Sequence, residues 1–337
     1  MHAPPEFTAR YKGKFAGGYD AARKELFANM RRLGASTRMG PAAPLFKPWA
    51  ELSADERVTQ ERLMEVYAGM VENLDMNIGR VVSALKKSGA YDNTVILFFS
   101  DNGPSAAYMG LYQGNADGEY VRKNFDTSLA NLGAPRSFAG LGPGWAYASS
   151  APFKSFKMFV TEGGTLSPLI VKGPMVRKPG TMNDAFLGVE DVFPTVLDIA
   201  KAQRGKTANG QTLEPLKGLS FLPMLTGQSP SVRADDFERG EELFGNKAWR
   251  QGRWKISWLP KPYGEARWQL FDTQADRGET RDLAAEQPAR LAAMAARYDR
   301  WARENSVVDW DYAYLGRELF DYFDWRKGIP VQIENRD

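Results

Sequence analysis

Thr-Val-Ile-Leu-Phe-Phe-Ser-Asp-Asn-Gly, residues 94–103, is the stretch that decides the fold of this chain. Its apolar and β-branched residues are too few for a helix and do not alternate with polar ones. This pattern predicts a strand buried on both faces of a parallel sheet. Ligands of such sheets gather just beyond the carboxyl ends of the strands, so Asp101 and Asn102 stand where an active site is expected.

Asp101 and Asn102 also have the chemistry of a metal site. A carboxylate and an amide carbonyl are hard oxygen donors, which suit Ca²⁺ or Mg²⁺ better than zinc. The other interpretation is a plain turn, because Asn-Gly and Asp-Asn-Gly are common turn sequences. The apolar strand before the pair favours the site.

The composition of the 337-residue chain excludes several classes of function. Its 44 basic and 41 acidic residues include no long run of one charge, so binding to nucleic acid or to an anionic membrane is not expected. No cysteine is present, which excludes disulfides and thiolate chemistry. The one histidine, His2, lies at the chain start, where a Ser-His-Asp triad is not expected.

The sequence gives little information on the cellular compartment of the protein. No apolar run reaches the roughly 18 residues that a membrane span needs. The first residues lack the charged and then apolar layout of a signal peptide. We therefore expect a soluble protein, in the cytoplasm or the periplasm.

Apolar periodicity predicts the helices that surround the strand. Ser53 and Glu56 form a capping box, and apolar residues at helical spacing continue to about Lys87, where Gly89 follows. Further helices are expected over residues 19–33 and 191–202. Residues 104–150 are rich in glycine and aromatic residues with little periodicity, and we expect a long loop over the strand end.

The sequence changes character at a polar stretch around residues 229–236. Trp254, Ile256 and Trp258 alternate beyond it, and Trp268 with Leu270 indicates another strand, so a small antiparallel sheet is predicted. A helix over residues 288–304 would pack on that sheet. The predicted domains are an α/β domain at 1–232, an antiparallel sheet with a helix at 233–307 and an aromatic tail at 308–337. We expect the tail to dock either on the main body or on a second subunit, and the second alternative would give a homo-oligomer.

Lys157 is the second candidate site residue. It precedes a strand-like run at residues 168–172, with Gly163 and Gly164 between them. An ammonium can hold an oxyanion as a compact point charge, and paired glycines let backbone segments approach closely. The competing interpretation is an ordinary solvated lysine at the surface.

In their order, these stretches resemble the sulfatase family, specifically its bacterial arylsulfatase-type branch in the alkaline-phosphatase-like superfamily. Each motif alone is weak, but the shared order covers nearly the whole chain. The motifs are Tyr-Ala-Gly-Met at 67–70, Ser-Asp-Asn-Gly at 100–103, Asn-Phe-Asp-Thr-Ser-Leu at 124–129, Lys157 with Glu-Gly-Gly at 162–164, Phe-Pro-Thr-Val-Leu-Asp at 193–198, and Trp-Gln-Leu-Phe-Asp at 268–272.

The resemblance implies a wound α/β sheet with a smaller C-terminal α+β domain, in which antiparallel strands are packed by a helix. It also implies that the substrate is a small-molecule sulfate ester. In the implied hydrolysis, the hydrated diol of a formylglycine attacks the sulfur atom beside a bound Ca²⁺. Asp101 and Asn102 would be metal ligands, with Asp101 also touching the diol. Lys157 would bind the sulfate oxygens as a catalytic residue.

The chain also departs from the family pattern. It contains no Cys- or Ser-x-Pro-x-Arg motif, which carries the nucleophile, and no early Asp-Asp pair followed by glycine. We therefore expect the C-terminal part of a sulfatase, begun at an internal methionine, with an incomplete sheet and no activity of its own. Calcium takes 6 to 8 ligands, so two oxygens should bind it weakly or not at all.

Two alternatives stay open at this point. One is a pseudoenzyme or binding module that keeps the scaffold without catalysis. The other is a related phosphoryl-transfer enzyme, which Lys157 followed by Glu-Gly-Gly argues against.

Overall fold

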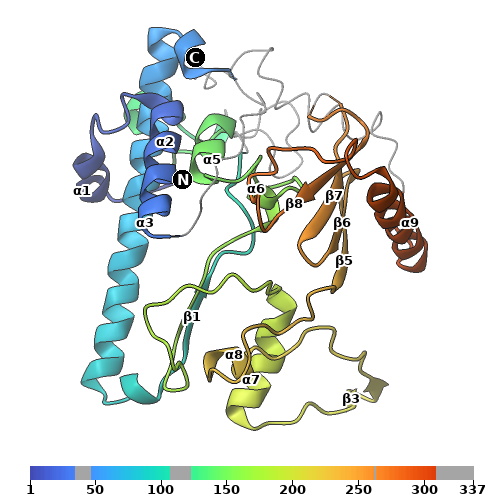
Figure 1. Cartoon of the computed structure of the whole chain (residues 1–337). Coiled ribbons are helices and arrows are strands. Elements are labelled where there is room, and N and C mark those ends of the chain that lie inside the picture. Colours follow the sequence, from blue (N-terminus) through green and yellow to red (C-terminus); the bar gives the residue numbers. More distant parts are fainter. Residues whose placement is uncertain (35–46, 107–122, 262, 309–337) are drawn as a thin grey trace. The chain divides into compact units, whose positions relative to one another are not determined.

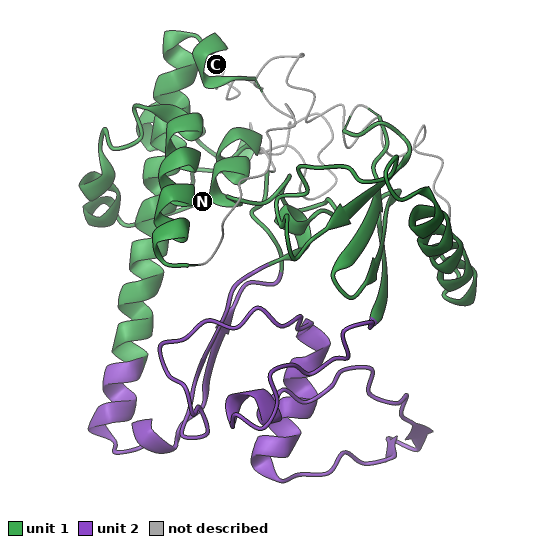
Figure 2. Cartoon of the chain, in the orientation of Figure 1, with its two compact units in different colours: residues 1–81, 102–166, 238–337 green, residues 82–101, 167–237 purple. Residues whose placement is uncertain are grey.

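The computed structural model describes residues 1–34, 47–106, 123–261 and 263–308 (Figure 1). The chain forms two compact units, which Figure 2 colours separately. The first comprises residues 1–81, 102–166 and 238–337, and the second comprises residues 82–101 and 167–237. The domain bounds at 232 and 307 stay predictions, and the aromatic tail beyond Val308 lies outside the described residues.

Several helices lie within the first unit. They are α1 (Pro5–Thr8), α2 (Gly18–Arg32), α5 (Pro143–Ser149), α6 (Glu162–Thr165) and α9 (Pro288–Glu304), with the short 3₁₀ turns η1 (Ala9–Tyr11), η2 (Trp49–Glu51) and η5 (Leu129–Asn131). The long helix α3 (Ala54–Lys87) begins in the first unit and ends in the second.

The predicted start and end of α3 are confirmed. The Ser53 N–H donates to Glu56 Oε2 at 2.7 Å, and the Glu56 N–H donates to Ser53 Oγ at 3.2 Å, which is the expected capping box. Gly89 follows the helix with a φ of +72°, a conformation that favours glycine. Of the described helices, even this longest one lacks the apolar length that a transmembrane segment requires.

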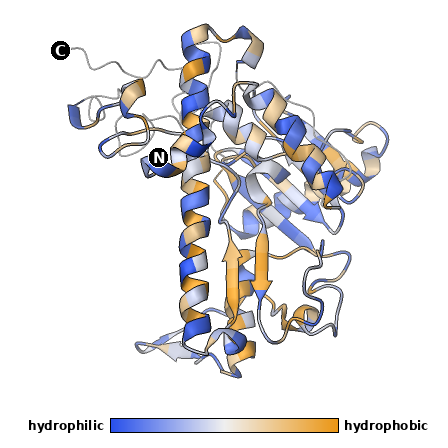
Figure 3. Cartoon of the chain, turned by 90° about the vertical axis from the view of Figure 1, so that its left-hand side faces the viewer, coloured by the Kyte–Doolittle hydropathy of each residue, from blue (hydrophilic) through white to orange (hydrophobic). Residues whose placement is uncertain are grey.

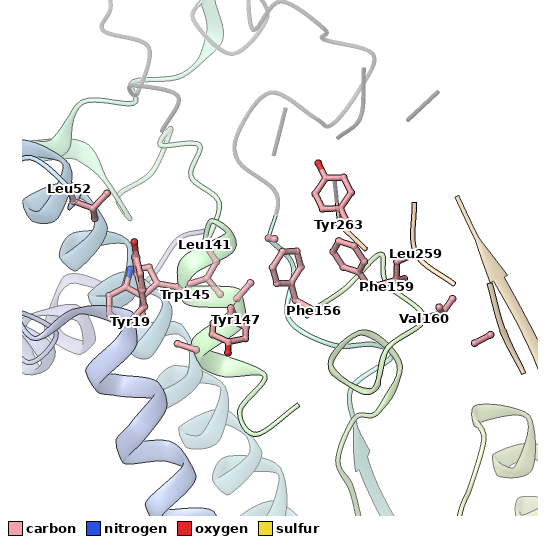
Figure 4. Packing of buried hydrophobic residues seen from close by; sticks show 14 residues of the cluster. Tyr19, Leu52, Leu141, Trp145, Tyr147, Phe156, Phe159, Val160, Leu259 and Tyr263 are labelled. Atoms are coloured by element: carbon pink, nitrogen blue, oxygen red, sulfur yellow. The ribbon is translucent and has the colours of Figure 1, made fainter. Parts of the chain in front are cut away.

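Trp145 belongs to the cluster of buried hydrophobic residues that Figure 4 shows. It is fully buried, its indole N–H donates to the Gln60 carbonyl at 2.8 Å, and its ring meets Tyr19 edge-on at 5.7 Å. The helix α5 that carries Trp145 corrects the prediction of a loop over residues 104–150. Pro143, which occupies its first turn, is the signal that could have predicted it.

The C-terminal sheet (β5 to β8) is a four-stranded antiparallel sheet in chain order. Its strands are β5 (Glu238–Leu243), β6 (Asn246–Gln251), β7 (Trp254–Trp258) and β8 (Trp268–Asp272). Ile256 pairs with Trp249 on one side and with Leu270 on the other. Helix α9 covers this face with Met294 and Tyr298, as the alternation of the strands and the helical period predicted.

The second unit contains two two-stranded antiparallel ladders and two short helices. β1 (Ile96–Phe99) pairs with β2 (Leu169–Lys172), and β3 (Thr207–Ala208) pairs with β4 (Gln211–Thr212). The helices are α7 (Val192–Ala200) and α8 (Leu222–Leu225), with 3₁₀ turns η3 (Tyr91–Asn93) and η6 (Val189–Asp191). Arg233 holds both carboxylate oxygens of buried Asp191, at 2.6 and 2.8 Å.

The surroundings of β1 differ from the prediction. Among the described residues β1 pairs with β2 alone, and the pairing is antiparallel rather than parallel. Phe98 and Phe99 are 40% and 41% exposed, and their neighbour Ile170 is 62% exposed. Figure 3 shows the apolar character of this pair of strands. The apolar run therefore predicted the strand correctly, but the predicted burial of both its faces is wrong. In the described residues β1 belongs to a ladder of only two strands, which leaves Phe98 and Phe99 exposed.

Candidate functional site

The two predicted parts of the site are joined through their backbones. The Lys157 N–H donates to the Pro104 carbonyl at 3.0 Å, and the Gly103 N–H donates to the Gly164 carbonyl at 2.9 Å. These residues all belong to the first unit. The segment that follows the apolar strand and the segment that carries Lys157 are therefore neighbours, although some fifty residues separate them in the sequence.

Glycines make this close approach possible. A Cβ on Gly103 would lie 1.9 Å from the Gly163 carbonyl oxygen, and one on Gly164 would lie 2.0 Å from the Phe159 carbonyl oxygen. A Cβ on Gly163 would lie 2.3 Å from the carbonyl oxygens of Lys154 and Ser155. Such distances to backbone atoms leave no room for any side chain, so the predicted role of the glycine pair is confirmed.

The Lys157 loop, residues 152–161, has a constrained backbone. Ser155 and Met158 take φ values of +60° and +85°, which cost a residue with a side chain on the order of 1–3 kcal/mol each. Phe156 and Phe159 anchor the loop, because both rings are 2% exposed and meet edge-on at 5.3 Å (Figure 4). Lys157 lies between these anchors in the sequence and is half-buried. Its role as an oxyanion ligand stays a prediction.

Asp101 and Asn102 lie on either side of the boundary between the units. Asp101 is exposed and is the last residue of its segment in the second unit. Asn102 is half-buried in the first unit, where its Nδ2 donates to the Gly103 carbonyl at 2.8 Å. The roles of both residues as metal ligands stay predictions.

A buried charge cluster adjoins the Lys157 loop. The Glu162 carboxylate accepts from Lys255 Nζ at 2.8 Å and pairs with the Arg250 guanidinium. Lys255 Nζ also lies 3.3 Å from Glu279 Oε1, and Glu279 Oε2 accepts the Glu162 N–H at 2.9 Å. Arg250, whose Nη1 donates to Thr273 Oγ1 at 2.8 Å, completes the charge cluster with Glu162, Lys255 and Glu279.

Opposite charges decide the protonation of this cluster. Burial by itself would raise the pKa of Glu162, but Arg250 and Lys255 outweigh burial and lower it to about 2. Burial likewise opposes the charge on Lys255, yet its two carboxylate neighbours raise its pKa. Burial raises the pKa of Glu279, with Lys255 opposing. Glu162 and Lys255 are therefore both charged at neutral pH.

Asp101 and Asn102 are the type of ligand that calcium prefers, but they provide too few oxygen atoms to complete a calcium site. Asp101 and Asn102 offer hard oxygens. In the parts of the chain that the structure describes, no group of three or more histidine, aspartate or glutamate side chains could hold a metal ion. Calcium takes 6 to 8 oxygens, so two side chains do not complete a site. A complete calcium site would need further oxygen donors.

Comparison with known proteins decides the family. The family model described as Sulfatase matches residues 1–202, which is more than half of the chain. The chain belongs to the sulfatase family. This match confirms the predicted resemblance. Hydrolysis of sulfuric esters is the general activity of the relatives.

Two curated relatives match most of the chain. An uncharacterized sulfatase of Schizosaccharomyces pombe is 36% identical over 313 residues, which is 91% of this chain and 56% of that protein. An arylsulfatase of Klebsiella aerogenes is 30% identical over 239 residues, 70% of this chain and 51% of that protein. The chain thus spans about half the length of these relatives.

A solved structure supports the fold. Ps i-CgsB, crystallised in complex with k-i-k-neocarrahexaose, superposes with a TM-score of 0.50 at 21% identity, over 90% of this chain and 59% of that one. The likeness concerns the fold alone. It confirms the predicted α/β class of fold, in which the C-terminal part combines antiparallel strands with a helix.

Sequence reasoning missed the buried charge cluster. Lys255 alternates with Trp254 and Ile256 along β7, and alternation alone would place it on the solvent side of a sheet whose other face packs on α9. The structure buries it to 2% exposure instead, because Glu162 and Glu279 lie against it. A lysine directly between Trp254 and Ile256 is the signal that could have suggested a buried partner.

Replacing Gly164 by alanine should destabilise the first unit by about 1–3 kcal/mol, the usual cost of forcing atoms into a packed site. Its Cβ would meet the Phe159 carbonyl, which cannot move without the loop. The matched control is Gly205→Ala, whose Cβ would meet only the Thr207 carbonyl at an ordinary 3.4 Å. Urea unfolding measures both, and equal stabilities would contradict the close approach.

The lowered pKa of Glu162 predicts a specific loss of stability in acid. A carboxylate whose folded pKa lies below its ordinary 4.5 contributes stability that is complete above that value and is lost as the pH falls toward about 2. Removing the charge by Glu162→Gln should cost about 3–5 kcal/mol at pH 7, because Lys255 is left buried without its main partner.

The stability difference between wild type and Glu162→Gln should therefore shrink below pH 4.5, by up to about 1.4 kcal/mol per pH unit. Urea unfolding between pH 7 and pH 3.5 measures it. The raised pKa of Glu279 acts in the opposite sense, since its contribution is complete below its ordinary pKa and is lost as pH rises. A difference that stays constant over this range would count against the assignment.

Proposed function

We propose that this chain is the part of an arylsulfatase-type enzyme that holds the sulfate group of a sulfate ester during hydrolysis. The observation that carries the proposal is the backbone contact between the Lys157 loop and the segment after β1, through Lys157 to Pro104 and Gly164 to Gly103. Both segments contain motifs by which the chain resembles sulfatases, Ser-Asp-Asn-Gly at 100–103 and Lys157 with Glu-Gly-Gly at 162–164. A half-buried lysine on a constrained loop is suited to binding an oxyanion.

The chain's own residues would have distinct roles in this reaction. Lys157 would bind the sulfate oxygens and stabilise the negative charge that grows on them in the transition state. Asp101 and Asn102 would orient a cation against the same group with their hard oxygens. Calcium and a formylglycine, the groups that sulfatases generally use, would supply Lewis-acid and nucleophilic chemistry when present.

We place the nucleophile in polypeptide beyond these 337 residues. The chain contains no Cys- or Ser-x-Pro-x-Arg motif and spans only 56% and 51% of the two relatives. Whether that polypeptide belongs to a longer reading frame or to a separate chain is open to experiment. In either case, the 337 residues alone would be inactive.

Exposed apolar side chains support this placement. In the second unit Phe98, Phe99 and Ile170 on the β1–β2 ladder are at least 40% exposed, and Phe193 on α7 is 50% exposed. Large apolar surfaces of this kind usually mark contacts with other polypeptide. We propose that the remainder of the sulfatase covers them.

A non-catalytic binding module is the second candidate function. The absence of the nucleophile motif from this chain is the observation that favours it. Such a module would keep an oxyanion site at Lys157 without turnover. The assay that follows separates the two.

The test is hydrolysis of an aryl sulfate by the chain alone and by a protein extended upstream to the length of its relatives, both with Ca²⁺. We expect turnover only in the extended protein, and a loss of about 10²–10³ in kcat on Lys157→Ala, the usual effect of removing one such charge stabiliser. Lys178→Ala, at an exposed lysine, is the matched control. Absence of turnover with retained sulfate binding would favour the binding module, and faster cleavage of an aryl phosphate would favour a phosphoryl-transfer enzyme.

We further propose that the aromatic tail, residues 308–337, docks on the main body or on a second subunit, because so many aromatic residues seldom remain in water. Deleting residues 308–337 should then lower solubility or change the oligomeric state. Size-exclusion chromatography with light scattering measures the mass of both proteins. An unchanged mass together with unchanged solubility would refute the docking.

A further inference from the structure

The buried charge cluster has no part in the chemistry proposed above. Its four members come from four places in the chain: Glu162 begins α6, Arg250 lies on β6, Lys255 lies on β7, and Glu279 follows β8. Lys255 and Glu279 are each 2% exposed, and Glu162 is 5% exposed. Two cations and two carboxylates are thus enclosed between the C-terminal sheet and the start of α6.

Stability alone is a poor explanation for such a cluster. Transfer of charges from water into a protein interior costs several kcal/mol per ion, and apolar residues of similar volume are often as stabilising or more so. Ion pairs instead fix the orientation of their partners, because charged hydrogen bonds have preferred geometries. The useful question is therefore which segment the cluster fixes in place.

The cluster holds Glu162 by both its side chain and its backbone. Lys255 and Arg250 bind the Glu162 carboxylate, and Glu279 accepts the Glu162 N–H at 2.9 Å. The next two residues are Gly163, which donates to the Lys154 carbonyl at 2.9 Å, and Gly164. A displacement of Glu162 would therefore be transmitted directly to the Lys157 loop.

Two further contacts link the C-terminal sheet to this loop. Asn246, fully buried at the start of β6, lies with its Nδ2 at 3.4 Å from the Met158 carbonyl, which it can reach as a donor. The Lys154 ammonium lies 5.4 Å from the centre of the Phe271 ring on β8, within the range of a cation–π contact. The sheet thus holds the loop on both sides of Lys157.

We propose that Lys255, with Arg250 and Glu279, is a positioning residue that sets the place of Lys157 by fixing Glu162. The C-terminal sheet is then part of the sulfate-binding apparatus, although none of its residues touches the substrate. The inference rests on the proposed function in so far as Lys157 binds sulfate. The geometric link between the cluster and the loop can be tested without that assumption.

The test is amide hydrogen exchange in the full 337-residue chain and in the variant Lys255→Met, which keeps the length of the side chain and removes its charge. We expect exchange in residues 154–166 to become at least about tenfold faster, the equivalent of 1.4 kcal/mol of local stability. Exchange in α9 and in β6 should change less than about threefold on the same scale. Arg253→Met is the matched control, because it breaks an exposed ion pair with Asp272 in the same sheet.

Equal acceleration throughout the sheet, α9 and the loop would show a merely structural role and overturn the proposal, as would unchanged exchange in the loop. If Lys255→Met does not fold, Glu279→Gln gives the same reading, because the amide replaces one of the two acceptor oxygens that face Lys255 and the Glu162 N–H by an NH2 donor. Selective acceleration of residues 154–166 in that variant supports the proposal, and its absence refutes it.

Titration with inorganic sulfate by calorimetry separates this inference from the proposed function. Equal sulfate affinity in wild type and Lys157→Ala would contradict the proposed function and leave the exchange result standing. Lost affinity in Lys157→Ala, with about tenfold weaker binding in Lys255→Met, supports both. Lost affinity in Lys157→Ala with wild-type affinity in Lys255→Met would overturn the positioning role.

Discussion

The close packing of Gly103 against Gly163 and Gly164 is the contact on which the candidate site depends. Backbone atoms meet there with no space for a Cβ, and the Gly103 N–H donates to Gly164 at 2.9 Å. Backbone-to-backbone contacts are stiffer than contacts between long side chains, since no rotamer can relax them. The segment after β1 and the Lys157 loop are therefore held in one arrangement.

The surroundings of the Lys157 loop maintain this arrangement. Phe156 and Phe159 fix it to the aromatic core around Trp145, and the charge cluster at Glu162 fixes it to the C-terminal sheet. Left-handed backbone at Ser155 and Met158 persists because both anchors over-determine it. The first unit of this sulfatase thus places one half-buried lysine by two independent kinds of packing, apolar and ionic.

Local patterns predicted what depends on local physics. The Ser53–Glu56 capping box and the period of α9 correctly indicated both helices, because caps and amphipathic faces are written in adjacent residues. The partner of β1 and the burial of Lys255 depend on segments more than seventy and ninety residues away in the chain. No periodicity within β1 or β7 contains that information, so the antiparallel pairing and the identity of the partners of Lys255 could not be predicted. The Lys157 loop was found because its residues resemble a family motif.

The central claim is that Lys157, Asp101 and Asn102 serve one sulfate and one cation. A crystal structure of the protein extended to the length of its relatives, with sulfate and Ca²⁺, tests it most directly. We expect Lys157 Nζ at about 3 Å from a sulfate oxygen and the oxygens of Asp101 and Asn102 at about 2.3–2.6 Å from calcium. A Lys157 ammonium more than about 15 Å from the Asp101 carboxylate, beyond the span of a small-ligand cleft, would contradict the account.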